Sequence, residues 1–149
     1  MSLRPDALQQ ILIDPANNGV YQLPSSAFEA VCDAAAAEGL IYYSCDLVEA
    51  TTGEAVLEKL AKALKLPEHF GNNFDALYDC LTDLTWQHTS ASVIVLSGVD
   101  TLYSCDSESW ETLLSVLASA AEYWQGEETP FWVFIDMQAD GLAHLPTFA

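Results

Sequence analysis

Three aspartates spaced four residues apart are the side chains in this sequence best placed to do chemistry: Asp75, Asp79 and Asp83. Residues four apart are neighbours on one stripe of a helix, so like charges there repel by roughly a few tenths of a kilocalorie per mole for each pair. Aspartate is also a weak helix former, and no Lys or Arg follows Lys65 to offset the repulsion. Unfavourable local features such as this repulsion and weak helix propensity are concentrated at functional sites. The row of aspartates is therefore a candidate cation-binding surface.

The charge of the whole chain supports an interaction with something basic. Four Lys and Arg residues face 22 Asp and Glu residues, giving a formal net charge of -18. This field repels nucleic acid and anionic lipid and attracts basic proteins. A simpler reading is that the acidity keeps a chain with 51% hydrophobic residues soluble. The aspartate row is then an ordinary solvated helix face.

Neither a metal site nor a cofactor is predicted by the sequence. The three histidines have no HxH or HExxH spacing, and the four cysteines contain no CxxC pair. Asp75 and Asp79 offer the carboxylate pair of a metal-dependent hydrolase. However, no activated nucleophile and no Gly-rich phosphate loop accompanies them.

The chain is expected to be a cytoplasmic protein with reduced thiols. Its first residues, MSLRPDALQQ, lack the apolar run of a secretory signal. No stretch reaches the 18 or so continuous apolar residues of a membrane span, and buried free cysteines are the expected state of a cytoplasmic chain.

Strand and helix patterns alternate along the chain. β-Formers and short apolar runs predict strands at 20–23, 40–46, 93–96 and 131–135. Apolar periodicity and capping residues predict helices at 26–37, 54–64, 74–84 and 107–124. This order indicates an α/β fold with a small, mainly parallel sheet of roughly three or four strands and about four helices. In the third helix, Phe74, Leu77, Tyr78, Leu81 and Leu84 mark the expected buried face. The tryptophans, at 86, 110, 124 and 132, are expected in the core or at its edge.

The segment LPEHFGNNFDALYDCL, residues 66–81, closely resembles the central signature of the barstar family, intracellular inhibitors of secreted bacterial guanyl-specific ribonucleases. The shared residues are Leu66, Pro67, Glu68, Gly71, Asn73, Asp75, Ala76, Leu77, Asp79, Cys80 and Leu81. The order of elements around them also agrees, so the resemblance covers roughly residues 40–136. It implies a barstar-like domain at 40–149. Residues 1–39 are then an N-terminal extension, turns plus one helix, packed on the same domain.

The resemblance implies that the chain is not an enzyme and binds a basic ribonuclease in a 1:1 complex. In the family, an aromatic loop and the acidic helix after it plug the nuclease active site. Asp75 and Asp79 would then take the place of substrate phosphates through charge-assisted hydrogen bonds, and Gly71 would allow close backbone approach. The implied partner-binding residues are His69, Phe70, Gly71, Asn73, Asp75, Asp79, Asp83, Ser119 and Glu122.

Several positions depart from the family pattern. His69 and Phe70 stand where the family has tyrosines, and Tyr78 replaces a tryptophan. The family also uses a glutamate on its last helix, where an ungapped alignment places Ser119; Glu122 lies one turn further on. The partner is therefore expected to be a different ribonuclease from the best-known one.

Three functions remain open from the sequence. The first is inhibition of a basic ribonuclease, either the cell's own secreted enzyme or a toxin for which this chain is the immunity protein. The second is metal-dependent hydrolysis through Asp75 and Asp79. The third is an acidic mimic that binds another nucleic-acid-binding protein.

Overall fold

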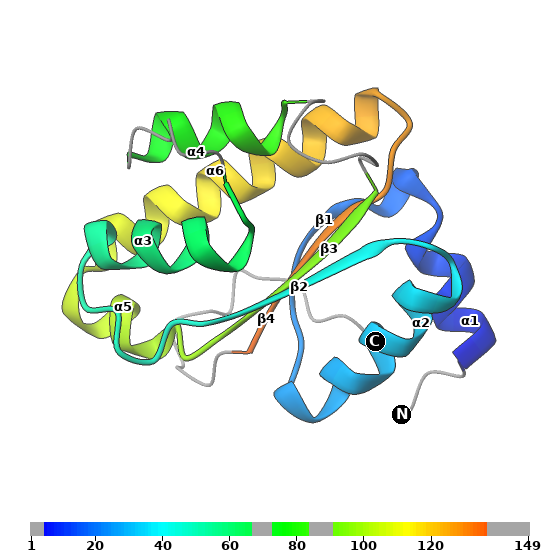
Figure 1. Cartoon of the computed structure of the whole chain (residues 1–149), viewed down its shortest axis with the longest axis horizontal. Coiled ribbons are helices and arrows are strands. Elements are labelled where there is room, and N and C mark those ends of the chain that lie inside the picture. The colour runs from blue at the N-terminus through cyan, green and yellow to red at the C-terminus, as the bar shows by residue number, and fades with distance from the viewer. Residues whose placement is uncertain (1–4, 67–72, 84–90, 137–149) are drawn as a thin grey trace.

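The computed structural model describes residues 5–66, 73–83 and 91–136, in which helices and strands alternate (Figure 1). The N-terminal part contains α1 (Pro5–Leu12), the short 3-10 helix η1 (Pro15–Asn17), β1 (Gly19–Gln22), a second 3-10 helix η2 (Ser25–Ala27) and α2 (Phe28–Ala37). The remainder contains β2 (Ile41–Asp46), α3 (Gly53–Ala63), α4 (Phe74–Leu81), β3 (Ser92–Ser97), α5 (Asp100–Cys105), α6 (Ser107–Gly126) and β4 (Phe131–Ile135).

All four strands are parallel and lie in the order β1-β4-β3-β2. The two central strands are short apolar runs, VIVL within β3 and FWVFI in β4, and every residue of these runs is buried. Such runs are typical of strands covered on both faces, since both sides of a parallel sheet are packed against helices. The predicted α/β fold with a parallel sheet is confirmed.

The helices form two layers, one on each face of the sheet (Figure 1). Because strand residues alternate between faces, Val93 and Val95 pack in the core formed with α1 and α2. Ile94 and Leu96 pack in the other core, beneath α3, α4, α5 and α6. Three of the predicted core tryptophans, at 110, 124 and 132, are buried, whereas Trp86 lies outside the described residues.

Six α-helices are described, against the roughly four expected. The additional ones are α1 and α5, with 8 and 6 residues. The six residues of α5 span less than two helical turns, too few for apolar periodicity to distinguish this helix from a loop. The segment before residue 40 also contributes β1, which pairs with β4 through Val20 and Val133. Its helices α1 and α2 bury Leu8, Leu12 and Val31 against the sheet.

Asp106 joins the beginning of α6 to the beginning of α3. Its carboxylate accepts hydrogen bonds from the Ser109 backbone at 3.2 Å, the Ser109 hydroxyl at 2.6 Å and the Gly53 backbone at 3.3 Å. The hydrogen bond from the Ser109 hydroxyl is the largest cause that lowers the pKa of Asp106, and the two backbone hydrogen bonds add to it. A carboxylate at a helix N-terminus also complements the helix dipole.

We expect the contribution of Asp106 to stability to depend on pH. Because its pKa is lower in the folded chain, its contribution is complete above the unfolded value near 3.8 and is lost as the pH falls through the folded pKa. Thermal unfolding of the wild type and Asp106→Asn between pH 7 and 3 measures this. The wild type should be the more stable protein at pH 6, and the difference should shrink toward pH 3. A difference that stays constant over this range would contradict the assignment.

A side chain at Gly98 is predicted to destabilise the fold more than one at Gly39. It follows β3 with a φ of +71°, and an added Cβ would lie 2.5 Å from the Val48 backbone nitrogen. Gly39 has a similar φ of +77° but no atom within 4 Å of an added Cβ. Gly39→Ala should therefore lower the free energy of unfolding only by the cost of an alanine in the left-handed conformation, about 1 kcal/mol. Gly98→Ala should lower the free energy of unfolding by about 2 kcal/mol or more, because the backbone near Val48 must also be displaced. Urea unfolding of both variants measures the difference, and equal losses would show that the close approach does not matter.

Candidate functional site

Helix α4 begins at a side-chain cap. The Asn73 side-chain oxygen accepts a hydrogen bond from the Ala76 backbone at 2.7 Å, and Asn73 itself has extended backbone angles. Asp75 follows in the first turn, where the helix dipole favours a negative charge. The helix ends at Leu81, and the Thr82 hydroxyl donates a hydrogen bond back to the Tyr78 carbonyl at 2.9 Å.

The inner face of α4 differs from the predicted one at Tyr78. Leu77, Cys80 and Leu81 are buried, and Phe74 packs partly against the same core. Tyr78 is only half-buried and lines a surface hollow. The buried face of α4 is rotated from the predicted one, so that Cys80 points to the core in place of Tyr78. Burial, reinforced by the nearby carboxylates of Asp83 and Asp79, raises the pKa of the Cys80 thiol, so this cysteine packs as a neutral apolar group. Leu84 lies outside the described residues.

Asp75 and Asp79 stand on the outer side of α4, and both are exposed. Within the part of the chain that the structure describes, neither carboxylate forms a hydrogen bond or an ion pair with another residue. The basic side chains Lys59, Lys62 and Lys65 belong to α3 and the turn that follows it. The two carboxylates are thus presented to solvent without a basic partner from the described chain.

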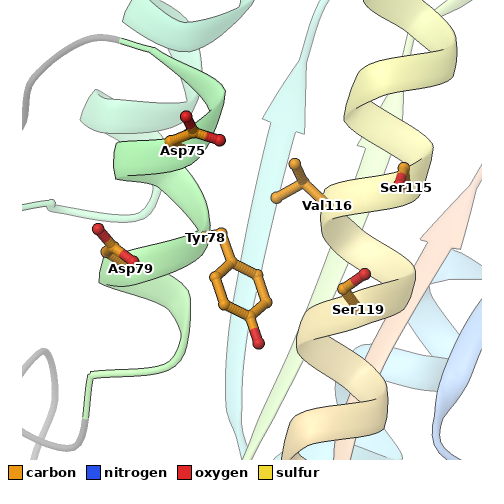
Figure 2. A pocket seen from close by; sticks show the side chains of 6 residues that line it. All are labelled: Asp75, Tyr78, Asp79, Ser115, Val116 and Ser119. Atoms are coloured by element: carbon orange, nitrogen blue, oxygen red, sulfur yellow. The ribbon is translucent and has the colours of Figure 1, made fainter.

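A groove separates α4 from α6 (Figure 2). Its first hollow, of about 400 Å³, is lined by Asp75, Tyr78, Asp79, Ser115, Val116 and Ser119. Figure 2 shows the Tyr78 ring between the two helices, with the aspartates on the α4 side and the serines on the α6 side. A second hollow of about 400 Å³ continues toward the end of α6 and is lined by Tyr78, Ser119, Glu122, Tyr123 and Gly126.

The packing of α6 fixes the width of this groove. Trp124 is buried, and its indole nitrogen donates a hydrogen bond to the Leu81 carbonyl at 2.9 Å. Leu113 and Leu117 on the same helix are buried in the core that also contains Leu77 and Leu81. Because buried hydrogen bonds and close packing resist displacement, both walls of the groove are held in place.

The structure brings several of the predicted partner-binding residues together. Asp75, Asp79 and Ser119 line the first hollow, and Glu122 lines the second. Asn73 lies instead at a separate hollow beside Asp106, where its side chain caps α4. The prediction that Asp83 continues the helical stripe of Asp75 and Asp79 is wrong, because α4 ends at Leu81 rather than at 84 and Asp83 lies, exposed, two residues beyond it. The remaining predicted residues, His69, Phe70 and Gly71, lie outside the described residues.

The sequence reading did not identify five of the groove residues, namely Tyr78, Ser115, Val116, Tyr123 and Gly126. On α6 a signal was present, since Ser115, Ser119, Glu122 and Gly126 recur at spacings of four, three and four. This spacing places them on one helical face. It gave no indication that α4 would lie opposite, because that depends on tertiary packing.

Three further observations concern the described residues. They contain no group of three or more His, Cys, Asp or Glu side chains arranged to hold a metal ion. No helix among them combines the length and the apolar character needed to cross a bilayer. The four cysteines are free thiols, but the expectation that they are buried holds only for Cys45 and Cys80, since Cys105 is exposed and Cys32 is partly so. Burial raises the pKa of Cys45 to about 11.

Comparison with solved structures finds a similar fold in another protein. The Aeropyrum pernix ORC2 protein, solved as ADPNP-ADP complexes, aligns with a TM-score of 0.55 at 16% sequence identity. The alignment covers 94% of this chain and 41% of that protein, so this chain spans less than half of its length. At this identity the likeness concerns the fold alone. Among curated protein sequences, none matches the chain significantly.

Comparison with protein-family models identifies a sequence relationship. The model described as Barstar (barnase inhibitor) matches residues 42–136. This range contains all of β2 except its first residue, together with α3, α4, β3, α5, α6 and β4, and therefore both walls of the groove. The match spans well over half of the chain, which accordingly belongs to the barstar family.

Proposed function

We propose that this protein inhibits a basic ribonuclease by placing α4 against the cationic active site of the enzyme. The observation that carries the proposal is the pair Asp75 and Asp79, which are exposed on one side of α4 without a basic partner from the described chain. A ribonuclease active site binds phosphates through basic side chains, and carboxylates can occupy the same positions. The family description, barnase inhibitor, names the same kind of partner.

The distribution of charge supports a basic partner. No Lys or Arg follows Lys65 in the sequence, whereas acidic residues continue beyond it, and the net charge is -18. Such a one-signed field accelerates encounter with a protein of opposite charge. It also disfavours direct binding of nucleic acid, since phosphates would be repelled.

The proposed contact surface extends beyond the two aspartates. It includes the segment before α4, with His69, Phe70 and Gly71, and the groove residues Ser119 and Glu122 on α6. The complex contains one copy of each protein and forms in the cytoplasm, where a cell needs protection from its own secreted ribonuclease or from a toxin of that class.

Two other functions would give different results in solution. A metal-dependent hydrolase using Asp75 and Asp79 would bind Mg²⁺, Mn²⁺ or Ca²⁺ with measurable heat in isothermal titration. An acidic mimic of nucleic acid would bind some other nucleic-acid-binding protein and leave ribonucleases active. Affinity capture from the source cell, followed by ribonuclease assays on the captured proteins, separates these functions from inhibition.

The first test is inhibition itself. The purified chain is titrated into barnase and into other small, basic, guanyl-specific ribonucleases, and RNA cleavage is measured. We expect at least one enzyme to lose activity in proportion to added protein, reaching completion at a 1:1 ratio. Full activity of every such enzyme at excess protein would contradict the proposal.

Asp79→Asn should weaken this complex severely. Removing the charge leaves a buried cation of the ribonuclease without its partner, and the dissociation constant should rise at least about 100-fold. Asp33→Asn is the matched control, because Asp33 is also an exposed helical aspartate but lies on α2, across the sheet. Calorimetry with the inhibited ribonuclease compares the two variants. Equal affinities for both variants and the wild type would show that Asp79 is not part of the contact surface.

The rate of association should fall steeply as salt is added. Exposed charges are screened over about 10 Å at 0.1 M salt, so long-range attraction between the acidic chain and a basic enzyme weakens while short contacts in the complex persist. Stopped-flow measurements between low salt and 0.5 M should show a large drop in the association rate constant and a smaller change in dissociation. An association rate that is independent of salt would contradict the electrostatic account.

A further inference from the structure

We propose that Asn18 is a positioning residue for partner binding, because it holds α6, one wall of the groove, from the side that faces away from the groove. Asn18 belongs to the segment before residue 40, which lies outside the range matched by the family model, residues 42–136. The inference rests on the proposed function, in which this groove meets a ribonuclease. It gives the N-terminal segment a part in binding, although this segment does not line the groove.

The Asn18 side chain joins three backbone groups that lie more than 100 positions further along the chain. Its amide nitrogen donates hydrogen bonds to the Thr129 carbonyl at 2.8 Å and to the Ala121 carbonyl at 3.3 Å. Its side-chain oxygen accepts a hydrogen bond from the Phe131 backbone at 2.9 Å. An asparagine amide can satisfy two carbonyls and one N–H together because it offers two donors and an acceptor. Asn18 therefore connects α6, the turn after it and β4.

These attachments lie on the side of α6 that faces away from the groove. Ala121 and Gln125 follow the groove residues Ser119 and Tyr123 by two positions, which is about 200° around a helix. The Gln125 side-chain amide donates a further hydrogen bond from this side, to the Ala16 carbonyl at 3.0 Å. The N-terminal segment thus supports α6 from behind, while α4 packs against it across the groove.

The backbone at the end of α6 depends on such support. Glu128, in the turn after α6, has a φ of +57°, a left-handed conformation that is unfavourable for a residue other than glycine. Residues in this conformation persist where the surrounding structure fixes them. Asn18 bonds to Ala121 before Glu128 and to Thr129 after it, so it fixes the turn from both sides.

Asn18 is itself fixed by the local structure. It is half-buried and directly follows η1, whose beginning is capped by the Asp14 carboxylate, which accepts a hydrogen bond from the Ala16 backbone at 3.0 Å. The Asn18 backbone donates a hydrogen bond to the Pro15 carbonyl at 3.1 Å. Because its own backbone is anchored, the side chain can hold α6 in one place.

Loss of these hydrogen bonds would let one wall of the groove move. Ser119 and Glu122 lie within two residues of Ala121 on the same helix, so they move with it. A binding surface must be held to within about 0.5 Å of its productive geometry, and a displaced wall should let the partner dissociate faster. The association rate depends mainly on net charge, so it should be unaffected.

Asn18→Asp and Asn17→Asp are a matched pair of variants. Both keep the size of the side chain and add one negative charge. Only the first places a carboxylate oxygen against the carbonyls of Ala121 and Thr129, where a donor is required. Asn17 is exposed, and its side chain bonds Asp14 within the same short helix.

Hydrogen exchange of each free variant, followed by NMR, measures how firmly α6 is held. Residues 119–126 should exchange at least about fivefold faster in Asn18→Asp than in Asn17→Asp. Rates in α3 and in the first half of α6 should be equal in the two variants. Should Asn18→Asp not fold, Asn18→Ala and Asn17→Ala repeat the comparison without the added charge. Equal rates at 119–126, or an acceleration spread evenly over the whole chain, would overturn the proposal.

Binding kinetics with a ribonuclease that the wild type inhibits test the effect on the complex. The complex of Asn18→Asp should dissociate at least about threefold faster than that of Asn17→Asp, with equal association rate constants because the net charge is the same. Equal dissociation rates would also overturn the proposal. If the wild type inhibits no ribonuclease, the proposed function fails, whereas exchange in the free chain still shows whether Asn18 holds α6.

Discussion

The buried contact between α4 and α6 is the interaction on which the candidate site depends. The Trp124 indole donates a hydrogen bond to the Leu81 carbonyl, and Leu77, Leu81, Leu113 and Leu117 share one core. Without this contact, α4, with 8 residues, would be too short to persist as a helix in water. Tertiary packing therefore compensates for the repulsion between Asp75 and Asp79 and keeps both carboxylates on one helix at the surface.

The rest of the fold supports this pair of helices. The central strands β3 and β4 are buried on both faces and carry α6 on one side and α1 with α2 on the other. Asp106 connects the beginning of α6 to α3, so the helices on this face are joined by hydrogen bonds as well as by apolar contacts. The acidic surface consequently lies on a rigid layer, which favours binding because little conformational entropy is lost on association.

Much of the fold could be predicted from the sequence because the strands and longer helices have clear periodicity and caps. The short helix α5 lacks that signal, and the prediction of Tyr78 in the core is wrong because periodicity alone does not fix the rotation of a helix to within one residue. The resemblance indicated that Asp75 and Asp79 belong to an interaction surface, a role that remains a proposal. The opposition of Tyr78 and Tyr123 across a groove could not be predicted, since it depends on how two helices far apart in sequence pack.

In the proposed complex, α4 and the facing side of α6 form the surface that meets a ribonuclease. Hydrogen exchange of the chain, alone and bound to the ribonuclease that it inhibits most strongly, tests this most directly. In the complex, we expect slower exchange at the beginning of α4 and along the turns of α6 that contain Ser115, Ser119 and Glu122, with no change in α1 or α2. Protection centred on α1 and α2, with α4 unchanged, would contradict it.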